Sequence, residues 1–165
     1  MINKYKHLQQ MRRKEKEIKN KKEIEGIIKK AIVCRLGLSF NDQPYIVPLN
    51  FGYEKNELHF HSAKAGKKME LIKKNKNVCF EIEADAELIK GEHACIDWKM
   101  YYSSVIGYGK AFIVEDMEEK KKSLDIIMKH YTGKSKFDYT EKNIRGVGII
   151  KVVIESMTGK KNGEE

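Results

Sequence analysis

The sequence predicts a single mainly β domain with peripheral helices, in which about six strands form a small barrel or a highly curved sheet. Apolar residues alternate with a period near two in several segments, among them 45–51 and 78–82. Most connections between such segments are too short for the crossovers that parallel strands need, which disfavours an ordinary parallel α/β sheet. The length of 165 residues suits one domain of ordinary size.

A helix and a strand are expected first. Residues 22–31 are predicted to be helical, because the isoleucines of this region recur at a partly helical spacing. These isoleucines are Ile18, Ile24, Ile27 and Ile28. A strand over 32–40 follows and ends at 41–44, where Asn, Asp, Gln and Pro form a typical turn sequence.

A hairpin and a second helix are predicted next. Residues 45–51 and 58–62 alternate like strands, and Glu54-Lys55-Asn56 supplies the turn that joins them. Beyond Gly66 the apolar spacing lengthens to that of a helix, which is expected to end near 75–77.

Two further strands are expected over 78–83 and 102–114. The residues between them, 84–98, show no clear period and are interpreted as a loop between short strands. Gly107 and Gly109 are predicted to mark a bulge or a bend.

The C-terminal part is predicted to contain a helix and a last strand. Asp116 is a plausible N-cap, and Gly133 follows Lys129 and His130 as a C-cap. A strand over 147–154 is expected next, and Gly159 is expected to end the ordered part.

The net charge of +9 is concentrated near the N-terminus. Through Lys30 there are 11 basic residues against 4 glutamates. A basic arm can bind nucleic acid or an acidic partner, but the interspersed glutamates and the isoleucine stripe favour a solvated amphipathic helix that docks on the barrel. Residues 1–21 are therefore expected to form an arm, 22–161 the folded domain and 162–165 a disordered tail.

The sequence shows neither a secretory signal nor an apolar run long enough to cross a bilayer, so a cytoplasmic protein is expected. The cysteines Cys34, Cys79 and Cys95 are odd in number and widely spaced. This pattern indicates reduced thiols in or near the core rather than a disulfide framework.

The start of the helix near Gly66 is the clearest candidate binding site. A helix N-terminus offers free N–H groups and the positive end of the dipole, and here Gly66 permits close approach while Lys67 and Lys68 add charge. These features are typical of a phosphate site. The alternative is a solvated lysine pair on a surface helix.

Two histidines lie just before that helix. His59 and His61 share one face of their strand, which permits a metal site with His93 and Cys95. Two histidines without a third placed ligand are a weak signal, and no metal is predicted. The alternative is that each histidine makes an ordinary hydrogen bond within the strand.

The order of several motifs resembles the FMN-binding split barrels related to pyridoxamine phosphate oxidase, and within them the nitroimidazole-resistance branch. The resemblance extends from about Met11 to Lys161. It depends on PLNFGY, FHSA and GKK in 48–68, and on later segments: VCFEIE, YYSSVIGYGKA, HYTGK and MTGKK.

The resemblance implies a split β-barrel and a homodimer with two FMN molecules at its interface. It assigns the phosphate to Ser62, Ala63, Lys67 and Lys68, and the ring to Pro48, Leu49 and Asn50. His61 would be an active-site histidine beside the flavin, and Ser103 and Ser104 would close the site from the other protomer. From the residues alone, Pro48 can equally protect a sheet edge, and the two serines can be surface hydroxyls.

The implied function is FMN-dependent reduction of small molecules such as nitroimidazoles. The alternatives are a non-catalytic flavin carrier or sensor, a split barrel that binds haem or another cofactor, and an interaction protein that uses its basic arm. Lys67 and Lys68 replace the arginine–lysine pair of the better-known oxidases, and the arginine-rich tail of those enzymes is missing. Pyridoxamine phosphate oxidation itself is therefore not expected.

Overall fold

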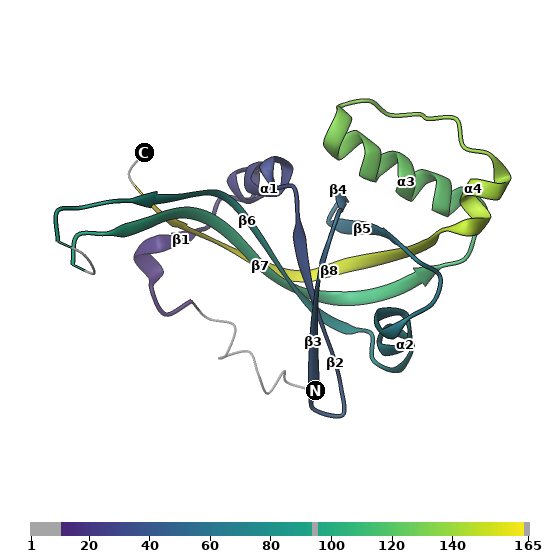
Figure 1. Ribbon diagram of the computed structural model, residues 1–165, viewed down its shortest axis with the longest axis horizontal. Coiled ribbons are helices and arrows are strands. Elements are labelled where there is room, and N and C mark those ends of the chain that lie inside the picture. The colour runs from purple at the N-terminus through teal and green to yellow at the C-terminus, as the bar shows by residue number, and fades with distance from the viewer. Residues whose placement is uncertain (1–10, 94–95, 164–165) are drawn as a thin grey trace.

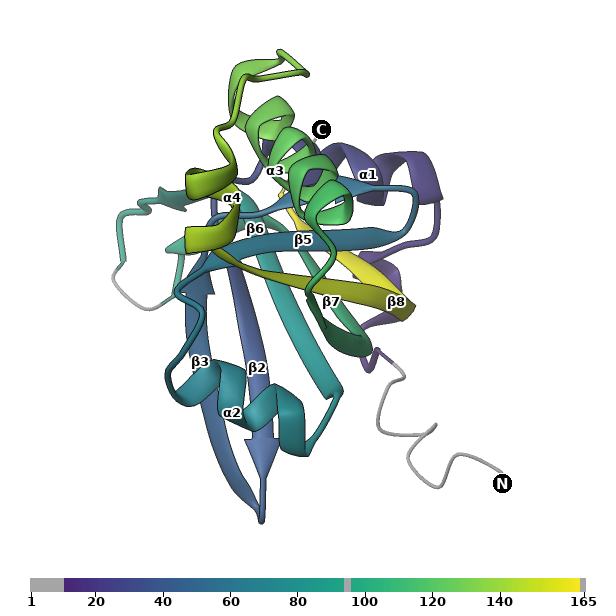
Figure 2. The same ribbon diagram turned by 90° about the vertical axis from the view of Figure 1, so that its right-hand side faces the viewer.

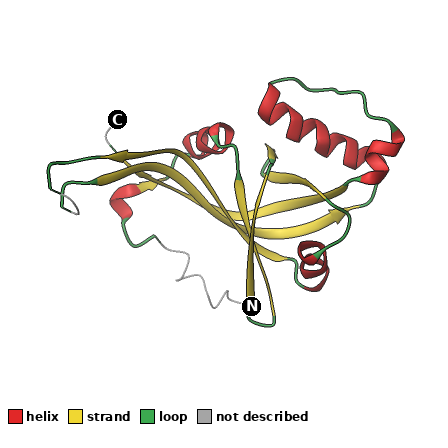
Figure 3. Cartoon of the chain, in the orientation of Figure 1, coloured by secondary structure: helices red, strands yellow, loops and turns green. Residues whose placement is uncertain are grey.

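The structure is a computed structural model that describes residues 11–93 and 96–163. Its strands are β1 (Glu17–Ile18), β2 (Cys34–Phe40), β3 (Gln43–Leu49), β4 (Gly52–Glu54), β5 (Glu57–Ser62), β6 (Asn77–Ile89), β7 (Lys99–Val114) and β8 (Gly148–Asn162). Its α-helices are α1 (Lys21–Lys30), α2 (Lys67–Lys74), α3 (Met117–Thr132) and α4 (Glu141–Gly146), and a short 3-10 turn spans Lys14–Lys16. Figure 3 shows that strands dominate.

The strands form one antiparallel sheet that curls without closing. Its order is β3-β2-β6-β7-β8-β5-β4, and β1 pairs with β8. None of the described pairings joins the two end strands, β3 and β4. Figures 1 and 2 show the curled sheet with α1 and α3 outside it and α2 near the β2–β3 hairpin. The expected mainly β split barrel is confirmed.

The core fills the inside of the curled sheet. Phe51, Phe60 and Phe80 are its largest buried side chains. A Cβ on Gly107 would lie 2.2 Å from the ring of Phe80, so only glycine leaves room for that ring. The register of β7 against β8 shifts between Tyr108 and Gly109, which confirms the expected irregularity.

The expected hairpin is wrong in its first strand, because 45–49 do not pair with 58–62, whereas the predicted turn at Glu54-Lys55-Asn56 is confirmed and joins β4 to β5. β3 pairs with β2 through a turn at Asn41–Asp42, both of which have positive φ. The chain then leaves the ladder at Asn50–Phe51, and the short β4 pairs with β5. The physical reason is the burial of Phe51, which takes the chain across the core from one sheet edge to the other. The prediction of an edge strand at Pro48 is confirmed, since β3 is an end strand.

The loop predicted for 84–98 is wrong for 84–89, which continue strand β6 and form a long hairpin arm with the start of β7; the described residues 90–93 and 96–98 are not in strands. Beyond a register shift between Ala84 and Glu87, β6 and β7 keep pairing up to Ile89 and Lys99. The arm extends beyond the body of the sheet, at the left of Figure 1. Both strands carry charged residues here, which hides the alternation that would identify a strand from sequence.

The N-terminal helix docks as expected. Ile24, Ile27 and Ile28 of α1 are buried, whereas Ile18 lies in β1. β8 continues to Asn162, so Gly159 does not end the ordered part. A Cβ on Gly159 would lie 2.9 Å from side-chain atoms of Ile18 and Ile24, so glycine here provides packing space rather than a strand end.

The C-terminal helices follow local capping rules. Asp116 accepts a hydrogen bond from the Glu119 N–H at 2.9 Å, and Gly133 has the left-handed C-cap conformation, as predicted. The short α4 was not expected; a capping box between Thr140 and Asn143 begins it. In the part of the chain that the structure describes, no helix has the length and apolar character needed to span a membrane.

Candidate cofactor site

The amino end of α2 is open and uncapped. Gly66 is its N-cap, with a φ of 113°, and no side chain caps the first turn. The Gly66 carbonyl accepts hydrogen bonds from the N–H groups of Met69 and Glu70, at 3.0 and 3.2 Å. A Cβ built on Gly66 would meet nothing within 4 Å, so the space beside this helix end is free. The position therefore suits an anion in contact with backbone N–H groups.

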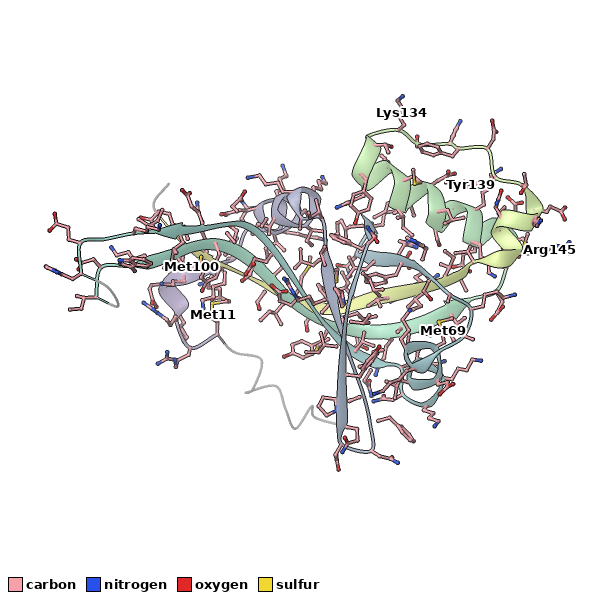
Figure 4. The ribbon with its side chains drawn as sticks, in the orientation of Figure 1. Met11, Met69, Met100, Lys134, Tyr139 and Arg145 are labelled. Atoms are coloured by element: carbon pink, nitrogen blue, oxygen red, sulfur yellow. The ribbon has the colours of Figure 1, made fainter. Side chains whose placement is uncertain are left out.

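The two lysines of this turn reinforce the positive end of the helix. Lys67 is exposed, and its Nζ lies 4.5 Å from the ring centroid of Tyr45 on β3. Lys68 is half-buried. α2 contacts β2 and β7, and its Met69, marked in Figure 4, is buried against the core. The helix is thus fixed while its basic end stays accessible.

The loop before α2 is held by its own hydrogen bonds. The Ser62 hydroxyl donates to the Ala63 carbonyl at 2.7 Å and lies 3.7 Å from the Met69 sulfur. A Cβ on Gly148 would lie 2.8 Å from the same Ala63 carbonyl oxygen, so β8 approaches this loop closely. Ser62 and Ala63 therefore fix the path of the loop, and in this arrangement the Ser62 proton is directed to the loop itself.

Residues 50–51 connect the end of β3 to the start of β4, the two end strands of the sheet. Pro48 and Asn50 are exposed and Leu49 is half-buried. The pairing of β4 with β5 begins at Gly52 and His59, so Asn50 lies two residues before the first paired residue of β4. The Lys67–Tyr45 contact places β3 beside the amino end of α2, and Pro48, Leu49 and Asn50 follow Tyr45 along the chain.

The two histidines of β5 have different surroundings. His61 is exposed. His59 is 3% exposed, lies under α3, and its Nδ1 is 3.0 Å from the Ser123 hydroxyl. Burial, reinforced by the Lys151 charge, lowers the pKa of His59 to about 4. His59 therefore serves the packing of α3 on the sheet, whereas His61 can meet a ligand.

The structure does not assemble the metal site that the histidines permit. His93 lies on the β6–β7 arm, and Cys95 is outside the described residues. Within 11–93 and 96–163 no group of three or more His, Cys, Asp or Glu side chains is placed to hold a metal ion. Of the other cysteines, Cys34 is buried and Cys79 is exposed on the sheet, so the expectation of core thiols holds for Cys34 alone.

The predicted site residues of β7 lie far from the rest. Ser62 pairs with Gly148 at one end of β8, and Ser104 pairs with Lys160, twelve residues further along that strand. At about 3.3 Å per residue, this is roughly 40 Å along the strand. Ser103 is buried, whereas Ser104 lies on the outer face with Ile106. Within one chain, the serines and the α2 end cannot contact the same small ligand.

The last turn of α3 contributes two residues that were not among the predicted site residues. The Tyr131 hydroxyl accepts a hydrogen bond from the Phe51 N–H at 2.9 Å and donates to the Ile32 carbonyl at 2.9 Å. His130 binds the Ala31 carbonyl through Nε2 at 2.7 Å, and its ring centroid is 4.4 Å from that of Phe51. The only sequence signal for them was the motif HYTGK.

A cavity of about 620 Å³ is lined in part by His130. It is bounded by α1, the β4–β5 turn and α3. Its lining residues are Glu25, Lys29, Tyr53, Glu54, Lys55, Ile126, Lys129 and His130. None of the predicted site residues lines it, so it is separate from the α2 end.

Comparison with known proteins agrees with the fold. A family model described as pyridoxamine 5'-phosphate oxidase matches residues 20–161. A solved structure of a provisionally assigned 5-nitroimidazole antibiotic resistance protein from Bacteroides thetaiotaomicron is 40% identical, with 88% of this chain and 86% of that chain covered and a TM-score of 0.77. No curated protein matches the chain.

More distant structures share the fold alone. A flavocytochrome from Azotobacter vinelandii is 16% identical, with 94% and 73% of the two chains covered and a TM-score of 0.78. An FAD- and haem-binding protein from Mycobacterium smegmatis is 14% identical, with 90% and 74% covered and a TM-score of 0.78.

Proposed function

Because this chain belongs to the pyridoxamine 5'-phosphate oxidase family, we propose that it binds FMN and reduces small molecules, with nitroimidazoles as the substrate class. The single observation that carries the proposal is the open, uncapped amino end of α2 with its lysine pair. The substrate class is supported by the 40% identity to the Bacteroides protein named for 5-nitroimidazole resistance.

The residues of this chain fit a flavin mononucleotide. Lys67, Lys68 and the free N–H groups of the first turn would hold the phosphate, because charged and backbone donors converge there. The exposed end of β3 would face the polar edge of the ring, since an edge strand leaves backbone groups without ladder partners. Bound FMN would supply the electrons for reduction of the substrate.

His61 would act on the substrate. It is exposed and is followed by Ser62, the last residue of β5 before the loop that leads to the proposed phosphate site. An imidazole can orient a nitro group by hydrogen bonding and can give up a proton near neutral pH. His61 is therefore assigned the catalytic role, while the buried His59 is not.

A second copy of the chain would complete the site. Ser104 is about twelve residues along β8 from the phosphate end, so it can reach a flavin only from another protomer. The outer face that carries Ser104 also exposes apolar side chains, with Ile106 at 47% and Tyr108 at 37% exposure, and Ile46 of β3 at 68%. This apolar face is suited to pairing with its own copy around a two-fold axis.

FMN binding is tested by the visible absorption of the protein and by two variants that each replace a pair of lysines. The purified protein is expected to show flavin absorption, or to gain it on addition of FMN. Lys67→Ala combined with Lys68→Ala should weaken FMN binding at least about tenfold, because charge-assisted contacts to phosphate are lost. Lys73→Ala combined with Lys74→Ala, at the other end of the same helix, should leave the dissociation constant unchanged.

The activity claim is tested with photochemically reduced protein under anaerobic conditions. Addition of a 5-nitroimidazole should reoxidise the flavin, and His61→Ala should slow this reaction without weakening FMN binding. A protein that binds FMN but is not reoxidised would instead be a flavin carrier or sensor. A colourless protein that takes up no FMN, or a haem spectrum, would refute the proposal.

A further inference from the structure

Aromatic rings of the β2–β3 hairpin contact a lysine at each end of α2. At the amino end, the Nζ of Lys67 lies 4.5 Å from the ring centroid of Tyr45, on β3. At the carboxyl end, the Nζ of Lys74 lies 5.0 Å from the ring centroid of Phe40, on β2. Figure 2 shows the helix alongside this hairpin. The helix end proposed for the phosphate therefore has an aromatic neighbour from a different element.

The Tyr45 ring is held firmly on its own strand. Tyr45 pairs with the buried Leu38 of β2, and it packs against the hydrophobic core together with Val47 and Leu49 of β3. A lysine side chain is flexible by comparison and loses rotamer freedom when it binds a ligand. A fixed ring in contact with Lys67 removes part of that freedom before any ligand is bound, and this preorganisation favours binding.

The charge of Lys67 stays available to a ligand. No carboxylate of the residues that the structure describes forms an ion pair with it. The side chain is exposed and belongs to the first turn of α2, whose amino end no side chain caps. An aromatic ring attracts an ammonium group without neutralising its charge, whereas a carboxylate in the same place would compete with an anion.

We propose that Tyr45 is a positioning residue, which holds Lys67 at the amino end of α2 and thereby favours a ligand that carries a phosphate ester. This inference rests on the proposed FMN site and adds a source of specificity to it. The Tyr45 ring should matter for FMN and not for riboflavin, because riboflavin has the same isoalloxazine ring without the phosphate.

The test compares the FMN and riboflavin affinities of Tyr45→Leu, which removes the aromatic ring. Its dissociation constant for FMN is expected to rise about two- to fivefold, as for the loss of one exposed cation–π contact, whereas that for riboflavin should not change. Tyr45→Phe keeps the ring and should retain the wild-type affinity for FMN.

The matched control is Phe40→Leu, which removes the ring beside Lys74 at the other end of the same helix. The Asn75 side chain donates to the Ser39 carbonyl at 2.9 Å, so the carboxyl end of α2 stays attached to β2 without this ring. The FMN affinity of Phe40→Leu should therefore equal that of wild type.

A double-mutant cycle shows whether the ring acts through Lys67. In a Lys67→Ala background, Tyr45→Leu should cause no further loss of FMN affinity. An equal loss in both backgrounds, an equal loss for riboflavin, or a loss in Tyr45→Phe would overturn the positioning role. An unchanged FMN affinity in Tyr45→Leu would overturn it too, and would leave the FMN site intact. Failure of the wild-type protein to take up FMN would overturn both.

NMR of the wild-type protein provides a measurement that does not require the leucine variant to fold. With FMN bound, the ε-methylene protons of Lys67 should be shifted upfield, because the face of an aromatic ring shields nearby protons. Unshifted protons would show that the Tyr45 ring does not hold Lys67 in the complex, and the inference would fail.

Discussion

At the scale of single residues, His59 is held as a neutral imidazole. It is 3% exposed, and its Nδ1 lies 3.0 Å from the Ser123 hydroxyl, which in turn donates to the Glu119 carbonyl. Burial is the main cause of its low pKa of about 4. The charged groups that act on it are Lys151 and Lys122, which lower the pKa, and Glu54 and Glu119, which raise it; the Glu57 carboxylate is 3.7 Å away.

The low pKa of His59 predicts a loss of stability in acid. Between its ordinary pKa of about 6.5 and its folded value of about 4, the unfolded chain binds a proton that the folded chain does not. The contribution of neutral His59 to the free energy of unfolding is fully present above about pH 6.5 and is lost as the pH falls towards 4. The total loss is roughly 3 kcal/mol.

Urea unfolding at pH 7 and pH 5 measures this effect. His59→Gln should show a smaller difference in the free energy of unfolding between the two pH values than wild type does. His61→Gln, which changes the exposed histidine of the same strand, should keep the wild-type difference. Equal pH dependence in His59→Gln and wild type would show that another group controls it.

At the scale of elements, one glycine in strand β7 and one in helix α1 differ in whether their surroundings leave room for a side chain. A Cβ on Gly109 would lie 2.2 Å from the Val153 carbonyl oxygen, a backbone atom of the paired strand β8. A Cβ on Gly26, in α1, would meet nothing within 4 Å. The first glycine is therefore required by the close approach of β7 to β8 near the register shift, and the second is not required by packing.

These two glycines give a matched prediction. Gly109→Ala should destabilise the protein by about 1 to 3 kcal/mol, because the strands must separate locally. Gly26→Ala should stabilise it by about 0.5 to 1 kcal/mol, because alanine is the better helix former. Midpoints of urea unfolding measure both changes, and a stable Gly109→Ala protein would contradict the close packing of β7 on β8.

At the scale of the whole molecule, exposed apolar residues gather on the outer face of β7 and on the arm. Leu88 and Met100 are cross-strand partners at 47% exposure each, and Met100 is marked on the arm in Figure 4. Ile106 and Tyr108 continue the exposed face along β7. A two-stranded hairpin is marginally stable alone in water, so a second copy packed along this face would also support the arm.

The proposed dimer gives a prediction about the apolar outer face. Ile106→Glu should shift the protein from dimer to monomer in analytical ultracentrifugation and also weaken FMN binding, because the second half of the site is lost. Ile32→Glu, which changes an isoleucine that is 70% exposed and precedes β2, should remain dimeric. A monomeric wild-type protein that binds FMN tightly would contradict the shared site.

Local rules settled much of the chain in advance. Asp116 and Gly133 set the bounds of α3 because caps act within one helical turn. Pro48 identified an edge strand because proline has no N–H to donate to a neighbouring strand. The order PLNFGY, FHSA and GKK predicted site residues on β3, at His61 and on α2, and their roles stay predictions. The Lys67–Tyr45 contact places β3 beside the start of α2.

Other features depended on contacts between distant segments. The alternation in 45–51 does not show which strand it pairs with. Phe51 is buried where the chain passes from β3 to β4, which lie at opposite ends of the sheet order. A glycine such as Gly159 is typical of a strand end, yet Gly159 lies within β8, where Ile18 and Ile24 from other elements pack over it. No local pattern identifies Tyr131 as a bridging residue, because its hydroxyl hydrogen-bonds to residues about 80 and 99 positions away.

The sequence by itself thus determined the strand-rich fold, the helix caps and the basic turn at the start of α2, since periodicity, capping and charge are properties of neighbouring residues. Only the tertiary structure decided which strands pair, which of His59 and His61 is accessible, and that Ser104 lies at the far end of β8 from Ser62. Those outcomes depend on burial and register between segments far apart in the chain, which no local pattern encodes.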